Sequence, residues 1–312
     1  MLERIRLRAV RHLIATLALC SLALAQPSIL SLRQAAMREP ENTSVWIALG
    51  EAYLAAEDYV SAKDSFLEAI ALDYLAGDAH FGLGLAEFER GDYPAALFAF
   101  SEVSRLYPER FEAHFNRGVT LAKLRRHEEA AEAFRSALEQ AASATPSQQI
   151  EAQSGLAVQL KEVGDYAGAA EAYAAALALR PGDEELSYRL GEAQYLAGAG
   201  LEALPMLAEQ EAVSSEARVS ALIADIYVGA EQPDYAIKAL ERALRKAQRA
   251  ADGPAQAGIL LKLGLLHRAM GQTDAAISAF QRASAADASA WQVRYNLGLS
   301  YLEAGRPADA LG

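Results

Sequence analysis

The chain carries apolar residues at the three- and four-residue spacing of amphipathic helices, in short stretches that come in pairs. Within residues 43–76, a first stripe contains Trp46, Leu49 and Tyr53, and a second contains Ala62 and Phe66. The residues between the two stripes break the pattern but leave no room for a long loop. We therefore expect two antiparallel helices that pack as a hairpin. Each helix, about 14 residues and about 21 Å long, would be marginally stable alone.

This hairpin pattern returns at a fixed interval. The landmarks that recur with a period of 34 residues are Gly50, Gly84 and Gly118, Ala62, Ala96 and Ala130, and Phe66, Phe100 and Phe134. Since one hairpin cannot bury both of its stripes, we expect each hairpin to stack on the next. The expected units are residues 43–76, 77–110, 111–144, 150–183, 184–216, 217–250, 257–290 and an incomplete unit at 291–312.

The landmarks resemble those of a known family. Trp46, Leu49, Gly50 and Tyr53 have the spacing W-x2-L-G-x2-Y, and Ala62 and Phe66 have the spacing A-x3-F, so the unit resembles the tetratricopeptide repeat. The resemblance implies an all-α fold, a right-handed superhelical solenoid of about seven to eight helix hairpins. The fifth unit is the weakest match, because Leu207 replaces the phenylalanine and Pro205 falls within the second helix.

The ends of the array and its two insertions depart from the period. Residues 26–42 resemble the second helix of a unit, with Leu32 in the place of Phe66, and we expect this half-repeat to cap the array. The insertion at 145–149 begins with Thr145 and a proline, which predicts a helix that starts early, and 251–256 is a second insertion. The last unit stops soon after its second helix begins, so we expect further repeats, a partner at this end, or local disorder.

The first 25 residues have the pattern of a secretory signal peptide. A basic segment at residues 4–12 precedes an apolar run, and Ala23-Leu24-Ala25 forms a cleavage motif, while the run is short for a membrane span. We expect a cleaved signal and an exported protein of the periplasm, cell envelope or secreted space. The alternatives are an uncleaved anchor or first helix, and lipid attachment at Cys20, although Leu19 stands where the bacterial lipobox has a small residue.

Charge and motifs exclude several classes of function. The net charge is −12, and the expected leader carries four arginines and one glutamate, so the remaining chain stands at about −15. Such a surface repels phosphate backbones, which argues against nucleic-acid binding. No Gly-rich phosphate loop, G-x-S-x-G or H-E-x-x-H motif is present. His80 and His114 occupy the same place in successive units, and we expect packed histidines rather than a metal pair. We therefore expect no enzyme, cofactor or metal site.

The resemblance also implies where a partner would bind. In the tetratricopeptide family, the first helix of each pair lines a concave groove that holds peptides or extended partners. Matching groove-facing places in this sequence gives a partner-binding set of Phe81, Phe88, Phe115, Asn116, Tyr188, Arg189, Tyr195, Lys262, Tyr295 and Asn296. Aromatic rings that alternate with amide and cationic groups can hold an extended chain. The alternative is that the rings pack within the stack.

One subset of the family is disfavoured. Some members grip a C-terminal carboxylate with a clamp of Lys and Asn side chains, but Ile47 and Glu51 occupy the places where the first unit would need them.

These observations predict a non-catalytic protein–protein interaction scaffold of the cell envelope or secreted space that binds an extended partner segment in its groove. One alternative is an architectural spacer that uses its ends and convex side. Another is binding of a glycan or cell-wall polymer, which the aromatic residues Phe81, Phe115, Tyr188 and Tyr295 would favour, although the surplus of acidic residues argues against it.

Overall fold

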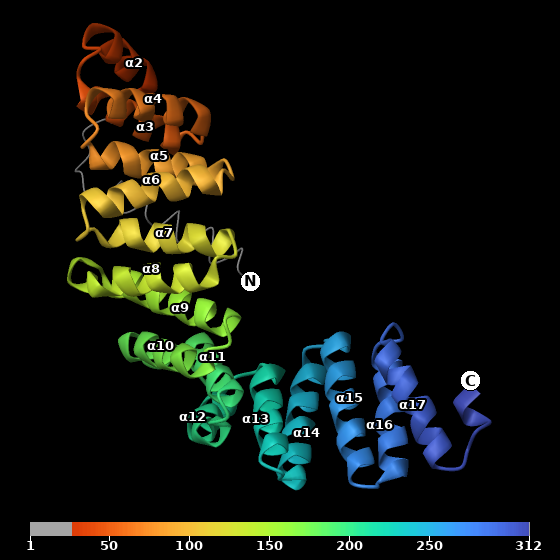
Figure 1. Cartoon of the computed structure of the whole chain (residues 1–312). Coiled ribbons are helices and arrows are strands. Elements are labelled where there is room, and N and C mark those ends of the chain that lie inside the picture. The colour runs from red at the N-terminus through yellow and green to blue at the C-terminus, as the bar shows by residue number, and fades with distance from the viewer. Residues whose placement is uncertain (1–26, 312) are drawn as a thin grey trace. The chain divides into compact units, whose positions relative to one another are not determined.

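The computed structural model describes residues 27–311, and within that range the chain forms helices and no strands (Figure 1). The all-α prediction is thereby confirmed. The expected signal peptide, with Cys20 and the cleavage motif, lies outside the described residues.

The helices follow one another with short turns between them. Their bounds are α2 (Ile29–Arg38), α3 (Thr43–Ala55), α4 (Tyr59–Leu72), α5 (Gly77–Glu89), α6 (Tyr93–Leu106), α7 (Phe111–Lys123), α8 (His127–Glu139), α9 (Pro146–Glu162), α10 (Tyr166–Leu179), α11 (Glu184–Leu196), α12 (Gly200–Val213), α13 (Ala217–Gly229), α14 (Pro233–Arg249), α15 (Gly253–Ala269), α16 (Thr273–Ala286) and α17 (Trp291–Glu303), with short 3-10 turns at Ala141–Ser143 and Asp309–Leu311. From residue 43 to residue 290, each expected unit corresponds to one helix pair, with α9 and α15 beginning in the two insertions.

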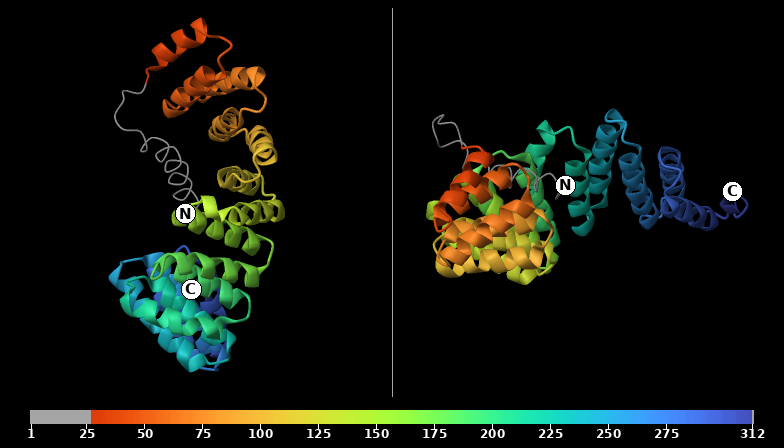
Figure 2. Two further views of the ribbon diagram at one scale, coloured as in Figure 1. Left: turned by 90° about the vertical axis from the view of Figure 1, so that its left-hand side faces the viewer. Right: turned by 90° about the horizontal axis from the view of Figure 1, so that it is seen from above.

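The helices group into two compact bodies, the first body ending at Arg180 and the second body beginning at Pro181. Within each body, every helix packs against the next one along the chain. The odd-numbered helices also contact one another directly, as α3 with α5 and α7 with α9 in the first body, and α11 with α13 and α15 with α17 in the second. Figure 1 and the right-hand view of Figure 2 show α13 to α17 of the second body, from teal to blue, lying side by side. Each body is therefore a helical solenoid built from stacked hairpins.

Phenylalanine rings hold the hairpins together because glycines leave room for them. Phe66 on α4 is fully buried, and an added Cβ would lie 2.7 Å from its ring at Gly50 on α3 and 2.2 Å from it at Gly82 on α5. The ring therefore fills a space between its own hairpin and the next. Phe134 repeats the arrangement with Gly118 and Gly155. These contacts explain why glycine and phenylalanine recur with the period of the repeat.

Polar side chains fix where individual helices begin. At the start of α9, Thr145 and Gln148 form a capping box, in which the Gln148 backbone N–H donates to Thr145 Oγ1 and the Thr145 N–H donates to Gln148 Oε1. The expectation that this helix starts early is confirmed. Asp58 caps α4 by accepting from the Ser61 N–H, and Asp92 and Asp165 cap α6 and α10 in the same way.

Candidate functional site

The predicted partner-binding residues lie on the odd-numbered helices α5, α7, α11, α15 and α17. The structure places four of them in the first body and six in the second. The exposed fraction of these side chains varies widely, so each group is described in turn.

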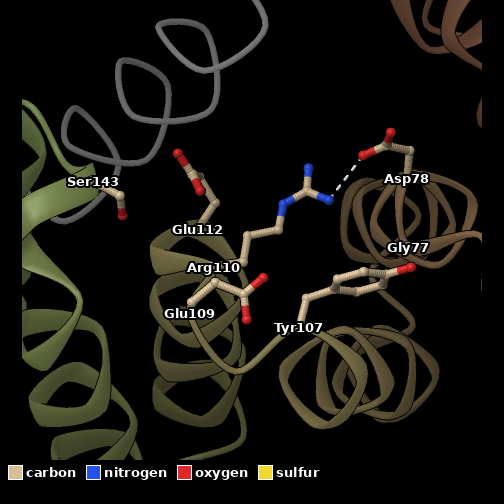
Figure 3. A pocket seen from close by; sticks show the side chains of 7 residues that line it. All are labelled: Gly77, Asp78, Tyr107, Glu109, Arg110, Glu112 and Ser143. Carbon is tan, nitrogen blue, oxygen red and sulfur yellow. Dashed lines mark hydrogen bonds and ion pairs between the residues drawn. The ribbon is translucent and has the colours of Figure 1, made fainter.

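Phe81 on α5 is covered from two sides. Its ring meets the edge of Phe100 with centroids 5.7 Å apart, and the Arg110 guanidinium lies 4.5 Å from its centroid. Arg110 extends on to Asp78, where Nη1 and Oδ1 form a 2.8 Å ion pair (Figure 3). Only 5% of Phe81 is exposed. A partner at this place would therefore meet the Arg110–Asp78 pair before it met the ring.

Phe115 and Asn116 on α7 are also engaged within the fold. Phe115 stacks on Phe111 with centroids 5.8 Å apart and meets the edge of Phe134 at 5.7 Å. Asn116 is buried, and its Nδ2 donates to the Glu112 carbonyl oxygen at 2.8 Å. One of the two amide hydrogens expected to bond a partner's backbone is therefore already used by the helix itself.

Phe88, near the end of α5, is more accessible. It is half-buried, meets the edge of Tyr93 with centroids 5.3 Å apart, and lies 6.0 Å from the Lys123 ammonium. The neighbouring rings and the cation hold its position without enclosing it.

Two carboxyl groups of the first two hairpins, those of Glu51 and Glu89, have raised pKa values, each caused in part by a carboxylate of the other hairpin. Glu51 on α3 interacts electrostatically with Asp78 on α5, and loss of hydration followed by this like charge raises the pKa of Glu51. Glu57, in the turn after α3, interacts with Glu89 at the end of α5. Loss of hydration and Glu57 raise the pKa of Glu89, while Lys123 opposes them. We refer to these four residues as the acidic pairs.

In the second body, a network of ion pairs surrounds Tyr188 and Arg189. Arg189 Nε pairs with Glu185 Oε1 at 2.7 Å, and Arg218 Nη2 on α13 pairs with Glu185 Oε2 at 2.7 Å. The Arg218 guanidinium also lies 4.4 Å from the centroid of the Tyr188 ring. Partial burial alone would raise the pKa of Glu185. The hydrogen bonds from both arginines outweigh this effect, so the pKa of Glu185 is lowered.

The remaining predicted residues differ in their surroundings. Lys262 on α15 reaches Asp225 on α13, with Nζ 2.6 Å from Oδ2. Tyr195 is half-buried against α12 and α13, near Gly200 and Gly229. On α17, Tyr295 is 60% exposed, and Asn296 Nδ2 donates to the Gln292 carbonyl at 2.8 Å. Tyr295 is thus the predicted ring with the most accessible surface.

Sequence reasoning missed three residues that contact the predicted set, namely Arg110, Arg218 and Asp225. It also missed the acidic pairs. A signal for Arg218 exists in the repeat itself. Arg218 holds the second place of its unit, as Glu185 does in the preceding unit, and stacked units bring equal places together.

The structure also contains two pockets in the first body. One, of about 360 Å³, lies where α5 and α7 begin (Figure 3), and its lining residues are Gly77, Asp78, Tyr107, Glu109, Arg110, Glu112 and Ser143. The second, of about 510 Å³, lies among α2, α3 and α4 and includes Met37, Trp46 and Tyr53. Figure 3 shows three carboxylates around the single guanidinium of the first pocket, so its lining is predominantly acidic.

Two further findings apply to the described residues. Between residues 27 and 311, no three His, Cys, Asp or Glu side chains gather in a way that could hold a metal ion. None of the helices in that range is both long enough and apolar enough to cross a membrane.

Comparison with known proteins bears on the fold. The sequence profile of the tetratricopeptide repeat matches residues 47–103, 90–145, 155–216 and 261–312. Among solved structures, YrrB, described as a TPR protein with an unusual peptide-binding site, is 19% identical with a TM-score of 0.50, and the match covers 68% of this chain and 98% of that one. The C-terminal part of a TPR repeat-containing protein from Cytophaga hutchinsonii is 13% identical with a TM-score of 0.63, covering 80% and 99%. No match was found among curated proteins. At these identities the structural likeness concerns the fold alone.

Proposed function

The chain belongs to the tetratricopeptide repeat family, and from this membership we propose that it is a non-catalytic scaffold that holds an extended segment of a partner protein against its odd-numbered helices. One observation carries this proposal. The odd-numbered helices leave aromatic side chains accessible whose positions are already fixed by neighbours: Phe88 beside Tyr93, and Tyr188 beneath Arg218.

Fixed positions favour binding of a flexible segment. Rings and charged groups that are ordered before binding lose little conformational freedom when the partner arrives. The partner segment then bears most of the ordering cost, and the scaffold contributes shape and apolar contact area. This mechanism needs no catalytic group.

Site-specific photo-cross-linking tests the proposed face. A benzophenone amino acid would replace Phe88 or Tyr295, which lie on odd-numbered helices, in the full chain in its native host. Phe98 on α6 and Tyr235 on α14 supply matched controls, because both are aromatic, more than half exposed and on even-numbered helices. We expect a discrete adduct from positions 88 and 295 and at least ten times less from 98 and 235. Equal or stronger adducts at the two control positions would reject the proposed face.

We further propose that the protein acts outside the cytoplasm, in the periplasm, cell envelope or secreted space. The support is the basic segment, apolar run and Ala-x-Ala motif within the first 25 residues. N-terminal sequencing of the protein from its native host tests this, with Gln26 as the expected first residue. An intact Met1 in the cytoplasmic fraction would refute export, and a lipid on Cys20 would replace cleavage after Ala25.

A further inference from the structure

We propose that the odd-numbered helices of the second body bind an extended partner segment in which one glutamate or aspartate side chain stands between apolar residues, with Arg268 on α15 receiving its carboxylate. The inference rests on the scaffold function proposed above and adds the chemistry of the partner. It concerns α13, α15 and α17 of the second body.

The guanidinium of Arg268 is the feature that points to a ligand. Arg268 lies near the end of α15 and is half-buried, and its Nη1 is enclosed by the protein but forms no hydrogen bond. Between residues 27 and 311 this arginine forms no ion pair either. Enclosing part of a guanidinium without a partner is unfavourable, because the group loses hydration and gains no bond in exchange. Since the residue stays partly accessible, a carboxylate from another molecule can reach it and form charge-assisted hydrogen bonds.

The other cations of these helices already have acceptors. In the second body, the lysines and arginines of the odd-numbered helices besides Arg268 are Arg189, Arg218, Lys262 and Arg294. Arg189 and Arg218 share one glutamate, Lys262 pairs with an aspartate 2.6 Å away, and Arg294 donates to a backbone carbonyl at 3.0 Å. The α15 helix itself contains no acidic residue. Within the described helices, Arg268 is therefore the one cation of this set that the fold leaves unpaired.

The charge of α15 and α17 also favours an anionic partner. Lys262, Arg268 and Arg294 stand against the single acidic residue Glu303, so three positive charges less one negative charge leave these two helices at +2, although the chain as a whole carries −12. Glu303 is exposed and does not pair with Arg268. A local positive field attracts an anionic segment to these helices and repels a cationic one.

Exposed apolar side chains flank Arg268 at matching places of the repeat. Val228 on α13 and Leu302 on α17 hold the twelfth place of their units, as Arg268 does in its own, and they are 48% and 55% exposed. Leu265, one turn before Arg268 on α15, is 38% exposed. The α15 helix contacts α17 directly and is joined to α13 by an ion pair, so equal places of these three units lie next to one another. Apolar residues on either side of a partner's acidic residue would bury this surface.

The spacing of these helices limits the partner. Packed helices lie about 8–10 Å apart, so crossing from one odd-numbered helix to the next requires about three residues of an extended segment at about 3.3 Å each. The matching sequence therefore has an acidic residue with apolar residues three places before and three places after it. The acidic side chain would meet Arg268 while the apolar side chains contact Val228 and Leu302. Because the carboxylate belongs to a side chain, no free C-terminus is required.

Fluorescence anisotropy with the full chain and labelled peptides tests the inference. The first peptide has a glutamate with leucines three places before and after it, the second has glutamine in place of the glutamate, and both have amidated C-termini. The protein variants are Arg268→Gln and the matched control Arg282→Gln, which removes one positive charge from an exposed place on α16. Arg268→Gln removes no hydrogen bond or ion pair within the described fold, so its urea midpoint should equal or exceed that of the parent protein.

We expect the glutamate peptide to bind the parent protein, with an affinity at least tenfold lower in Arg268→Gln and less than twofold lower in Arg282→Gln. The glutamine peptide should bind the parent protein at least tenfold more weakly and should not distinguish it from Arg268→Gln. Equal losses for both peptides in Arg268→Gln, equal losses in both variants, or no binding of the glutamate peptide would overturn the inference. If adducts form at positions 88 and 295 while the glutamate peptide does not bind, the scaffold proposal stands and this inference alone fails.

Discussion

The indole Nε1 of Trp46 donates a 2.9 Å hydrogen bond to the carbonyl oxygen of Pro40, six residues earlier. His114, two units later, makes the same contact from Nε2 to the carbonyl of Pro108 at 2.8 Å. Because a carbonyl oxygen only accepts, the imidazole must carry hydrogen on Nε2. His80 with Tyr74 at 2.9 Å and Arg294 with Ala288 at 3.0 Å complete the series. Three different side-chain types thus satisfy one backbone group in the turn that precedes an odd-numbered helix.

Removing this bond should loosen the turn between α2 and α3. The substitution Trp46→Phe keeps an aromatic ring but leaves the Pro40 carbonyl without its donor. We expect the free energy of opening this turn to fall by about 1 kcal/mol. Hydrogen exchange of the backbone amides measures this loss of stability. We expect faster exchange in α2 and α3 and unchanged exchange in the other helices. Trp291→Phe is the matched control, because Trp291 is 63% exposed and its exchange profile should not change. Unchanged exchange in α2 and α3 would show that the bond does not stabilise the turn.

The close approach of α4 and α5 gives a second prediction. In Gly82→Ala, the new Cβ would lie 2.2 Å from the fully buried Phe66 ring, so the ring or a helix must move, at a cost of about 1–3 kcal/mol. We expect a lower urea midpoint for the first body. Trp46 fluorescence in a Trp291→Phe background reports it, because Trp46 is then the sole tryptophan.

Glycine at an open helical position is the control for that experiment. Gly258 on α15 has no atom within 4 Å of an added Cβ, so Gly258→Ala should stabilise the second body by up to about 1 kcal/mol. A stabilising effect of Gly82→Ala would mean that the Phe66 contact is less tight than described.

The hairpins could be predicted from the sequence because their contacts depend on single residue types. Gly50 and Phe66 must be small and large respectively wherever two helices approach, so the requirement leaves a visible period. The burial of Glu87 could not be predicted in that way. It occupies the place of Tyr53 and is 3% exposed because Lys63, on the preceding helix, and Arg90 neutralise it. Such pairing depends on which helices are neighbours, which the period alone does not state.

The candidate site was less predictable for the same reason. The repeat pattern predicted that Phe81 and Tyr188 lie on the first helix of a hairpin, and they lie on α5 and α11, but the exposure of each ring depends on what covers it. Arg110 covers Phe81, and Arg218 lies over Tyr188, and both arginines come from other elements. How far such an arginine covers a ring depends on the packing of neighbouring helices, which the repeat pattern does not give, so the partner-binding role of these residues stays a prediction.

Acid should weaken the contact between the first two hairpins through Glu102. Hydrogen bonds from Arg105 and from the Tyr74 hydroxyl lower the pKa of Glu102 from 4.5 to about 2. Because the folded-state pKa is depressed, the stabilisation is fully present above about pH 4.5 and is lost as the pH falls through about 2. Glu102→Gln should therefore lower the urea midpoint at pH 7, and the difference from the parent protein should shrink between pH 4.5 and pH 2. Tyr74→Phe, which leaves Arg105 in place, should show a smaller difference. If the difference in urea midpoint between Glu102→Gln and the parent protein does not change with pH, the stabilisation does not come from the ionised Glu102 carboxylate.

The fifth unit offers a substitution that should stabilise the protein. Pro205 lies inside α12, so the Leu201 carbonyl lacks the N–H partner that a helix interior normally supplies. Pro205 is exposed, and Pro205→Ala restores the donor without disturbing buried side chains. We expect α12 to gain about 1–3 kcal/mol of local stability, measured as slower hydrogen exchange of its amides. Pro254→Ala is the control, because Pro254 stands in the first turn of α15, where no N–H is missed. Equal exchange in Pro205→Ala and the parent protein would show that α12 already compensates for the missing bond.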